Sequence, residues 1–112
     1  MLEVPLSTAP RSTILKVVAM VEYQDGAVVS RQITKAEGGN VTLFAFDQGQ
    51  ELSEHTAPYD ALLHVLEGEA EISISGNPFL LRTGQAIIMP ANEPHAVRAT
   101  RQFKMILTMI KA

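Results

Sequence analysis

Two stretches decide the fold: GQELSEHTAPYDALLHVLEG at residues 49–68 and GQAIIMPANEPHAVRA at residues 84–99. Each begins with a glycine and carries apolar runs of strand length bounded by Gly, Pro or Asn, a pattern typical of β-structure. Together they hold His55 and His95, two of only three histidines in the chain. A fold that brings these two side chains together creates a candidate metal or ligand pair.

Composition excludes several classes of function. At 112 residues the chain is expected to form one domain. Its net charge of −3 and scattered basic residues predict no nucleic-acid partner, since such a partner needs a clustered basic surface. The absence of cysteine excludes disulfides, thiolate catalysis and cysteine zinc sites. No apolar run approaches the roughly 18 residues of a membrane span, and residues 1–10 show no export signal. We therefore expect a cytoplasmic protein without a membrane partner.

The strand pattern predicts an all-β protein. Apolar residues recur in short runs, and turn residues separate them. Gly68 is expected to close a tight turn between two such runs. Residues 13–21 form a short apolar run that fits either a strand or one or two helical turns, and periodicity does not choose between them. The predicted strands are residues 27–35, 41–47, 51–56, 61–67, 69–75, 79–82, 85–89, 95–100 and 103–110.

Three of these strands, residues 41–47, 61–67 and 103–110, are largely apolar on both faces. A single antiparallel sheet with one wet side would carry polar residues on that side. One face should therefore line a barrel interior, and the other should meet a second sheet, the N-terminal arm or another subunit. We expect a symmetric homodimer. In this interpretation residues 1–39 are an arm with outer strands that packs on the barrel or on the partner subunit, and residues 40–112 form the barrel.

The spacing within both stretches resembles the two motifs of the cupin superfamily. The first motif is Gly, five residues, His, one, His, three or four, Glu, six, Gly. The second is Gly, five residues, Pro, one, Gly, two, His, three, Asn. This chain keeps the spacing of both motifs. It replaces the second His and the Glu of the first motif, and the second Gly and the final Asn of the second motif. The motif positions are filled by Gly49, His55, Ala57, Ala61 and Gly68, and then by Gly84, Pro90, Asn92, His95 and Ala99.

This resemblance implies a double-stranded β-helix, or jelly-roll barrel, over about residues 40 to 110. In the family, three His and one Glu converge on a divalent metal inside the barrel. Carried over by position, only His55 and His95 remain as metal ligands. The metal implied is Fe, Mn, Ni or Zn, and a site with so few protein ligands should be weak.

Four other polar residues lie near the motifs in the sequence. Asp60 precedes the lost Glu position, and strand alternation directs it away from the interior unless a bulge intervenes. His64 falls on the outer face by the same alternation, and we interpret it as packed at an interface. Glu54 and Glu93 are expected to face solvent at the barrel mouth.

Two hypotheses for function remain open. The first is a binding module that holds a small, partly apolar molecule in the barrel cavity, where the two Ala replacements leave more room. The second is a metal-dependent enzyme of isomerase, dioxygenase or decarboxylase type, with Asp60 or Tyr59 as acid or base. A sensor or accessory role is a third option. The predicted ligand-binding residues are His55, His95, Tyr59, Phe46 and Met89, beside Ala57 and Ala61.

Overall fold

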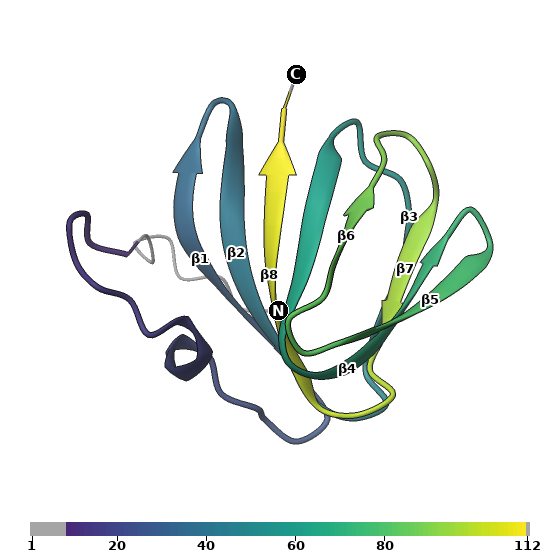
Figure 1. Ribbon diagram of the computed structural model, residues 1–112, viewed down its shortest axis with the longest axis horizontal. Helices are drawn as coiled ribbons and strands as arrows, with labels where there is room; N and C mark the ends of the chain where they lie inside the picture. The colour runs from purple at the N-terminus through teal and green to yellow at the C-terminus, as the bar shows by residue number, and fades with distance from the viewer. Residues whose placement is uncertain (1–8, 112) are drawn as a thin grey trace.

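The computed structural model describes residues 9–111, and within them the protein is nearly all β-structure (Figure 1). Short strands punctuated by Gly, Pro and Asn produce this architecture, as the sequence pattern predicted. No helix among the described residues is long and apolar enough to cross a membrane. In chain order the elements are the 3₁₀ helix η1 (Val17–Met20) and the strands β1 (Val28–Ala36), β2 (Gly39–Phe46), β3 (Glu51–His55), β4 (Asp60–Ile74), β5 (Asn77–Arg82), β6 (Ala86–Met89), β7 (His95–Arg98) and β8 (Phe103–Ile110).

The strands form two antiparallel layers that share β4. We call the first layer sheet A: β1, β2, β8, the first half of β4, and β6. The second layer, sheet B, holds β5, the second half of β4, β7 and β3. In Figure 1, β4 curves through the bottom of the view and joins the two layers. This two-layer arrangement confirms the predicted jelly-roll barrel.

Gly68 lies where β4 passes from one sheet to the other. The sequence predicted a tight turn here between two strands, and that prediction is wrong, because β4 is one strand of 15 residues. The two halves pair with different strands and not with each other, so the chain bends without folding back. Gly68 has a φ of +84°, and a Cβ at this position would overlap the carbonyl oxygen of Gln102. Only glycine fits this bend without strain.

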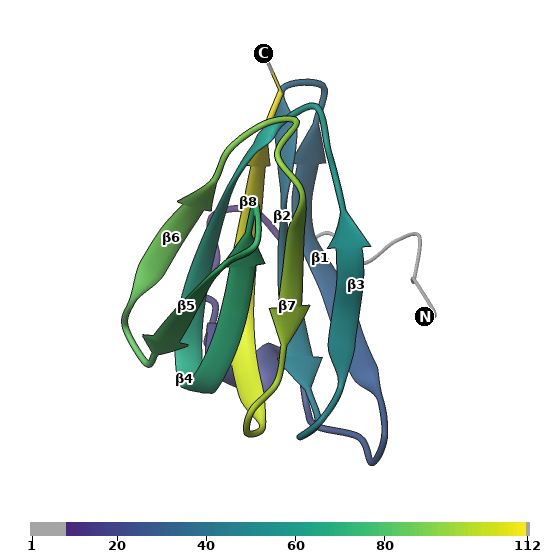
Figure 2. The same ribbon diagram turned by 90° about the vertical axis from the view of Figure 1, so that its right-hand side faces the viewer.

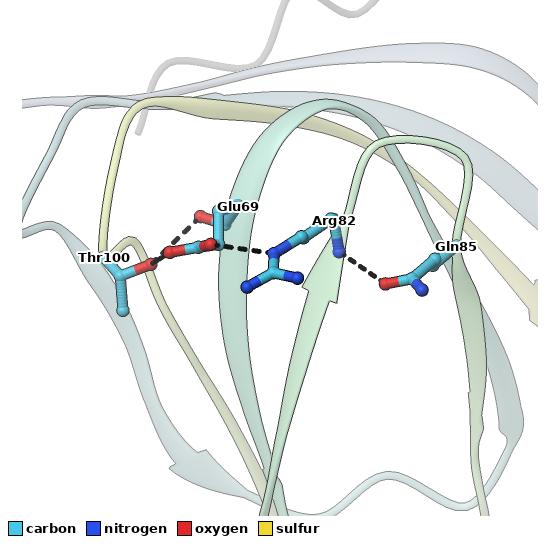
Figure 3. Close-up of polar contacts among 4 residues, drawn as sticks. All are labelled: Glu69, Arg82, Gln85 and Thr100. Atoms are coloured by element: carbon cyan, nitrogen blue, oxygen red, sulfur yellow. Dashed lines mark hydrogen bonds and ion pairs between the residues drawn. The ribbon is translucent and has the colours of Figure 1, made fainter.

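A polar cluster fixes the chain next to this bend (Figure 3). The Thr100 hydroxyl donates to Glu69 Oε2 at 3.1 Å, and Arg82 Nε donates to Glu69 Oε1 at 3.3 Å. The Arg82 backbone N–H donates to Gln85 Oε1 at 2.8 Å. Glu69 therefore links β5 and the β7–β8 loop to the bend in β4. The hydrogen bonds from Arg82 and Thr100 hold the pKa of Glu69 below its usual value.

The main core fills the space between the sheets. Along β4, Leu63 and Val65 face inward and are fully buried, and beyond the bend Ile72 takes the same role. Phe46 stacks on Phe103 with ring centroids 4.5 Å apart. Phe103 is the register partner of Gly68, so this stack lies at the bend. We call this part of the barrel the Gly68 end.

A smaller core lies on the outer face of sheet A, under the N-terminal segment. Leu43 and Ala45 of β2 are fully buried there, together with Val21 of the segment. Lys104 Nζ donates to the carbonyl oxygen of Val18 at 2.6 Å. The apolar outer face of sheet A is therefore partly covered by the residues that precede β1.

Within residues 9–27, η1 is the only helix or strand. Of the alternatives for residues 13–21, the structure has a single 3₁₀ turn, η1, rather than a strand. The division of the chain at residue 39 stays a prediction. β1 pairs with β2 along its length and so is part of sheet A, while residues 1–8 of the predicted arm lie outside the described residues.

Candidate functional site

His55 and His95 lie side by side on neighbouring strands of sheet B. Their Cα positions are register partners between β3 and β7, which Figure 2 shows next to each other. The two Nε2 atoms are 3.1 Å apart, and the rings meet edge to face with centroids 4.4 Å apart and an interplanar angle of 70°. The fold thus joins two side chains that are 40 positions apart in sequence.

A bulge in β3 directs His55 toward the interior. Leu52 pairs with Val97, and the next pair along the two strands is His55 with His95. Three steps along β3 therefore match two steps along β7. In a regular strand, side chains three positions apart lie on opposite faces. The extra residue resets the alternation, so that His55 shares the inner face with Leu52.

The pair lies at the end of the barrel opposite the bend, which we call the histidine end. Here the two loops of residues 56–59 and 90–94 connect the sheets, and the Asn92 N–H donates to the Ala57 carbonyl at 2.8 Å. Asn92 has a φ of +65°, which Asn tolerates better than most residues. His95 is buried, with 5% of its surface exposed, while His55 is exposed. A molecule arriving from solvent meets His55 first.

Backbone carbonyls fix the tautomers of both rings. His55 Nδ1 lies 2.7 Å from the Ser53 carbonyl oxygen, and His95 Nδ1 lies 3.2 Å from that of Glu93. A carbonyl oxygen only accepts, so each Nδ1 carries the hydrogen and donates it. In the neutral rings both Nε2 atoms are then lone-pair acceptors, and they face each other. Burial, and then the neighbouring His55, lower the pKa of His95, although the bond to the Glu93 carbonyl opposes this shift.

Where the family motif has its second His and its Glu, this chain has Ala57 and Ala61, whose side chains offer no donor atom to a metal. Ala61 is buried beside its register partners Met89 and Met109. Across residues 9–111 no group of three or more His, Cys, Asp or Glu side chains is arranged to hold a metal. A tightly held metal usually needs three or four protein ligands. The two histidines therefore do not by themselves fit a resident divalent metal.

The polar residues near the motifs are engaged elsewhere. Asp60 Oδ1 accepts the Ala91 backbone N–H at 2.9 Å, and Asp60 is exposed. Glu93 Oε1 accepts the Ser75 hydroxyl at 3.4 Å, also at the surface. His64 lies on the outer face of sheet A beside its register partners Ile106 and Ala86. Asp60 and Glu93 are therefore bonded to groups other than the histidine pair, and His64 lies on the far side of sheet A from it.

The other predicted ligand residues fall at different places. Met89 is buried, with 2% of its surface exposed, and faces the interior at the histidine end. Tyr59 is half-buried in the loop before β4, with Lys111 Nζ 5.4 Å from its ring centroid. Phe46 is fully buried in the stack at the Gly68 end, where its surroundings are those of a core residue.

Sequence reasoning missed two inward-facing residues near the pair. Leu52 and Ile74 are partly buried against the main core, as are Leu107 and Met109 of β8. Leu52 was missed because only the bulge places it on the same face as His55. Ile74 was missed because the bend resets the alternation of β4. No local signal in the sequence shows that the inside–outside alternation shifts at the bulge in β3 or at the bend in β4.

Two hollows in the protein surface lie away from the histidines. One of 430 Å³ lies between β5 and β6 and is lined by Phe79, Leu80, Leu81, Gln85, Ala86 and Ile87. One of 330 Å³ lies on the outer face of sheet B, around Arg98 and Glu71. The candidate site is therefore identified from the close approach of the His55 and His95 Nε2 atoms, and neither hollow is part of it.

Known proteins with this architecture support the family assignment. A conserved Streptococcus pyogenes protein of unknown function superposes with a TM-score of 0.88 at 32% identity, over 94% of this chain and 92% of that one. A cupin superfamily protein of Desulfitobacterium hafniense gives 0.87 at 25% identity, over 94% and 96%. A cupin 2 conserved barrel domain protein of Leptotrichia buccalis gives 0.84 at 39% identity, over 87% of this chain and 47% of that one.

Sequence comparison points the same way. The polyketide synthase CurC of Streptomyces cyaneus is 33% identical over 64 residues, or 56% of this chain. The matched part spans 42% of that relative's length. The model of the cupin domain family Cupin_2 matches residues 42–111, which include both motif stretches and the whole histidine pair. The chain belongs to this family of cupin domains.

Proposed function

We propose that this chain binds a small, partly apolar molecule at the histidine end, and that the imidazole pair accepts a hydrogen bond from a hydroxyl group on it. The supporting observation is the 3.1 Å approach of two Nε2 atoms whose rings each donate through Nδ1 to a carbonyl. Two lone pairs at this distance repel each other. A donor shared between them removes that repulsion and satisfies both acceptors.

The surroundings of the pair favour a ligand with an apolar body. Ala61, Met89 and Met109 face the interior at this end, and Met side chains adapt to irregular shapes. Leu52 and Ile74 add partly buried apolar surface on sheet B. Small-molecule sites typically combine such apolar walls with a few polar groups that fix orientation.

The Streptomyces cyaneus relative narrows the class of ligand. That protein is named a polyketide synthase. A polyketide carries keto, enol or phenol oxygens on a carbon skeleton, so it presents hydroxyl donors on an apolar body. We propose a phenol or enol of this kind for the present chain. The support comes from the fit of this chemistry to two imidazole acceptors.

The test uses two matched probes, 2-naphthol and 2-methoxynaphthalene, which share one aromatic body but differ in the donor. Isothermal titration of the full chain should give binding to 2-naphthol at least tenfold tighter than to the ether, because only the naphthol can donate. His55→Ala and His95→Ala should remove this preference. His64→Ala is the control and should keep it. Equal affinity for the two probes, or no binding of either, would contradict the proposal.

A metal-dependent enzyme is the second candidate. Cupins often bind metals, and one observation favours it here: Nδ1–H donation to a carbonyl leaves Nε2 free, as in histidines that ligate metals. Fe, Mn, Ni or Zn would be held by His55 and His95 alone. Since these two residues do not fit a resident metal, we assign no reaction step. Elemental analysis of protein purified without an affinity tag tests it. Near-stoichiometric metal that disappears in His95→Ala would favour the enzyme over the binding module.

A further inference from the structure

The two edge strands of the barrel, β1 and β3, each contain a bulge that turns a polar side chain inward. Within residues 9–111 the sheet path begins at β1 and ends at β3, and Figure 2 shows both strands on the right-hand side of the molecule. The register of β1 against β2 shifts by one residue between Gln32 and Thr34. Lys35, three positions after Gln32, therefore points to the same face as Gln32, just as the bulge in β3 directs His55. Bulges are common next to active sites, where they redirect a side chain.

The face that Lys35 and Gln32 share is the inner face of sheet A. Residues paired in register point to the same face of a sheet. The β8 members of these pairings, Leu107 and Met109, pack against the main core. The inner face is therefore apolar on β8 and polar on β1 and β2 near the histidine end. From β1 through β2 to β8, the inward rows are Lys35–Asn40–Met109 and Gln32–Thr42–Leu107.

The same hairpin carries apolar residues on its outer face. Leu43 and Ala45 are fully buried there under the N-terminal segment, with Val29 packed against them. In two packed sheets, apolar side chains normally fill the inside and polar ones face outward. The β1–β2 hairpin reverses this pattern near the histidines, whereas Phe44 and Phe46 keep it toward the Gly68 end. Polar side chains that are turned inward need polar partners, and a ligand can supply them.

The polar groups on this inner face are rich in hydrogen-bond donors. Asn40 and Thr42 are half-buried, and the Thr42 hydroxyl donates to Asn40 Oδ1 at 3.5 Å. This contact engages the amide oxygen, so Asn40 offers a ligand the two hydrogens of Nδ2. The Lys35 ammonium has three donors and no acceptor. The acidic residue closest to it along the chain, Glu37, follows in the exposed turn and not in the two inward rows.

We propose that the ligand carries a carboxylate, which Lys35 binds with Asn40 and Gln32 beside it. This inference rests on the function proposed above, because the same ligand places its hydroxyl group against His55 and His95. The two subsites lie on facing sheets, and packed sheets lie about 10 Å apart. A two-ring aromatic body with a hydroxyl group at one end and a carboxylate at the other spans that separation. The ligand class is a hydroxyaryl carboxylic acid or the corresponding enol acid.

The β1–β2 turn that carries Lys35 is fixed at the histidine end. The Lys111 backbone N–H donates to the Gly38 carbonyl at 2.8 Å, and Gly39 lies so close to Met109 that a Cβ would overlap its carbonyl oxygen. A site on fixed strands loses less entropy when a ligand binds. Lys35 is exposed, as His55 is. The carboxylate is therefore paired where its remaining lone pairs stay hydrated, which avoids the cost of a buried charge.

Isothermal titration of the full chain with 6-hydroxy-2-naphthoic acid and 6-hydroxy-2-naphthamide tests the carboxylate subsite. The two probes have the same shape and hydroxyl group, but only the acid is charged at neutral pH. Wild type should bind the acid about tenfold more tightly, because a charge-assisted hydrogen bond to Lys35 is stronger than a neutral one. Lys35→Met should abolish this preference and Lys35→Arg should keep it. Arg31→Met is the matched control, since it removes one positive charge from the outer face of the same strand, and it should keep the preference.

Failure of the carboxylate subsite differs from failure of the function on which it rests. If wild type prefers 2-naphthol to 2-methoxynaphthalene but binds the acid and the amide equally, only the carboxylate subsite is overturned. If no naphthol binds, both are overturned. A preference for the acid that survives in Lys35→Met overturns the role of Lys35, as does an equal loss in Arg31→Met. Circular dichroism should show every variant folded, because both substituted side chains are exposed.

Discussion

The two ends of the barrel are built on opposite principles. At the Gly68 end, the bend in β4 is closely packed against Gln102 and Phe103, and the ring of Phe103 stacks on Phe46. Glu69 beside it accepts a hydrogen bond from Thr100. At the histidine end, Ala61, Met89 and Met109 face the interior, and the Nε2 atoms of His55 and His95 lie 3.1 Å apart. Substitutions at the first end should therefore change stability, and those at the second should change binding.

The largest effect is expected for Gly68→Ala. A Cβ there would overlap the Gln102 carbonyl and approach Phe103 Cα to 2.8 Å, at a φ of +84°. We expect a loss of about 5 kcal/mol or more, comparable with the whole stability of a small domain. Gly84→Ala is the control: φ is also +84°, but nothing lies within 4 Å of the added Cβ. It should lose only about 1–2 kcal/mol in urea unfolding. Equal losses for the two variants would refute the steric account of the bend.

Phe46→Ala should have the next largest effect on stability. It removes a fully buried ring and its stack on Phe103, and such truncations typically lose about 3–5 kcal/mol. Its affinity for 2-naphthol at the other end should not change. Urea unfolding and titration on the same sample measure both quantities. A selective loss of binding with little loss of stability would place Phe46 in the ligand site.

His55→Ala should behave in the opposite way. His55 is exposed, so its removal should change the free energy of unfolding by less than about 0.5 kcal/mol. The affinity for 2-naphthol should fall at least tenfold, or about 1.4 kcal/mol. Unfolding and titration of this variant beside Phe46→Ala form a reciprocal pair. If His55→Ala proves as unstable as Phe46→Ala, the two ends do not differ as described.

The smallest expected effect is that the two ends lose stability at different pH values. The pKa of His95 is lowered from 6.5, so the unfolded chain binds the proton more readily. The associated stability is present above pH 6.5 and is lost as pH falls through the folded pKa. The pKa of Glu69 is lowered from 4.5, so its contribution disappears only below pH 4.5.

Melting temperatures followed from pH 8 to pH 3 would resolve these two steps. His95→Gln should remove the upper step and Glu69→Gln should reduce the lower one. Part of the lower step should persist, because the Gly26 N–H and the Gln102 side chain also lower the pKa of Asp47. An upper step that survives in His95→Gln would have to come from another group.

The sequence predicted the strands and the family, because strand spacing and glycine positions are local signals. It also placed His64 on the outer face by alternation within one regular stretch of β4. The rule that side chains alternate between the two faces gave wrong predictions at the bend in β4 and at the bulge in β3. The bend at Gly68 looked like a hairpin turn, since a glycine with positive φ serves either role. The bulge in β3, which directs His55, depends on pairing with β7 and leaves no local trace.

The tautomers of the two histidines test the central claim most directly. Nitrogen-15 NMR of the side chains above pH 7, in the full chain, should report Nδ1–H for both His55 and His95. Addition of 2-naphthol should shift both Nε2 resonances, while 2-methoxynaphthalene should shift neither and His64 should not respond. An Nε2–H tautomer in either ring, or a naphthol response confined to His64, would contradict the account.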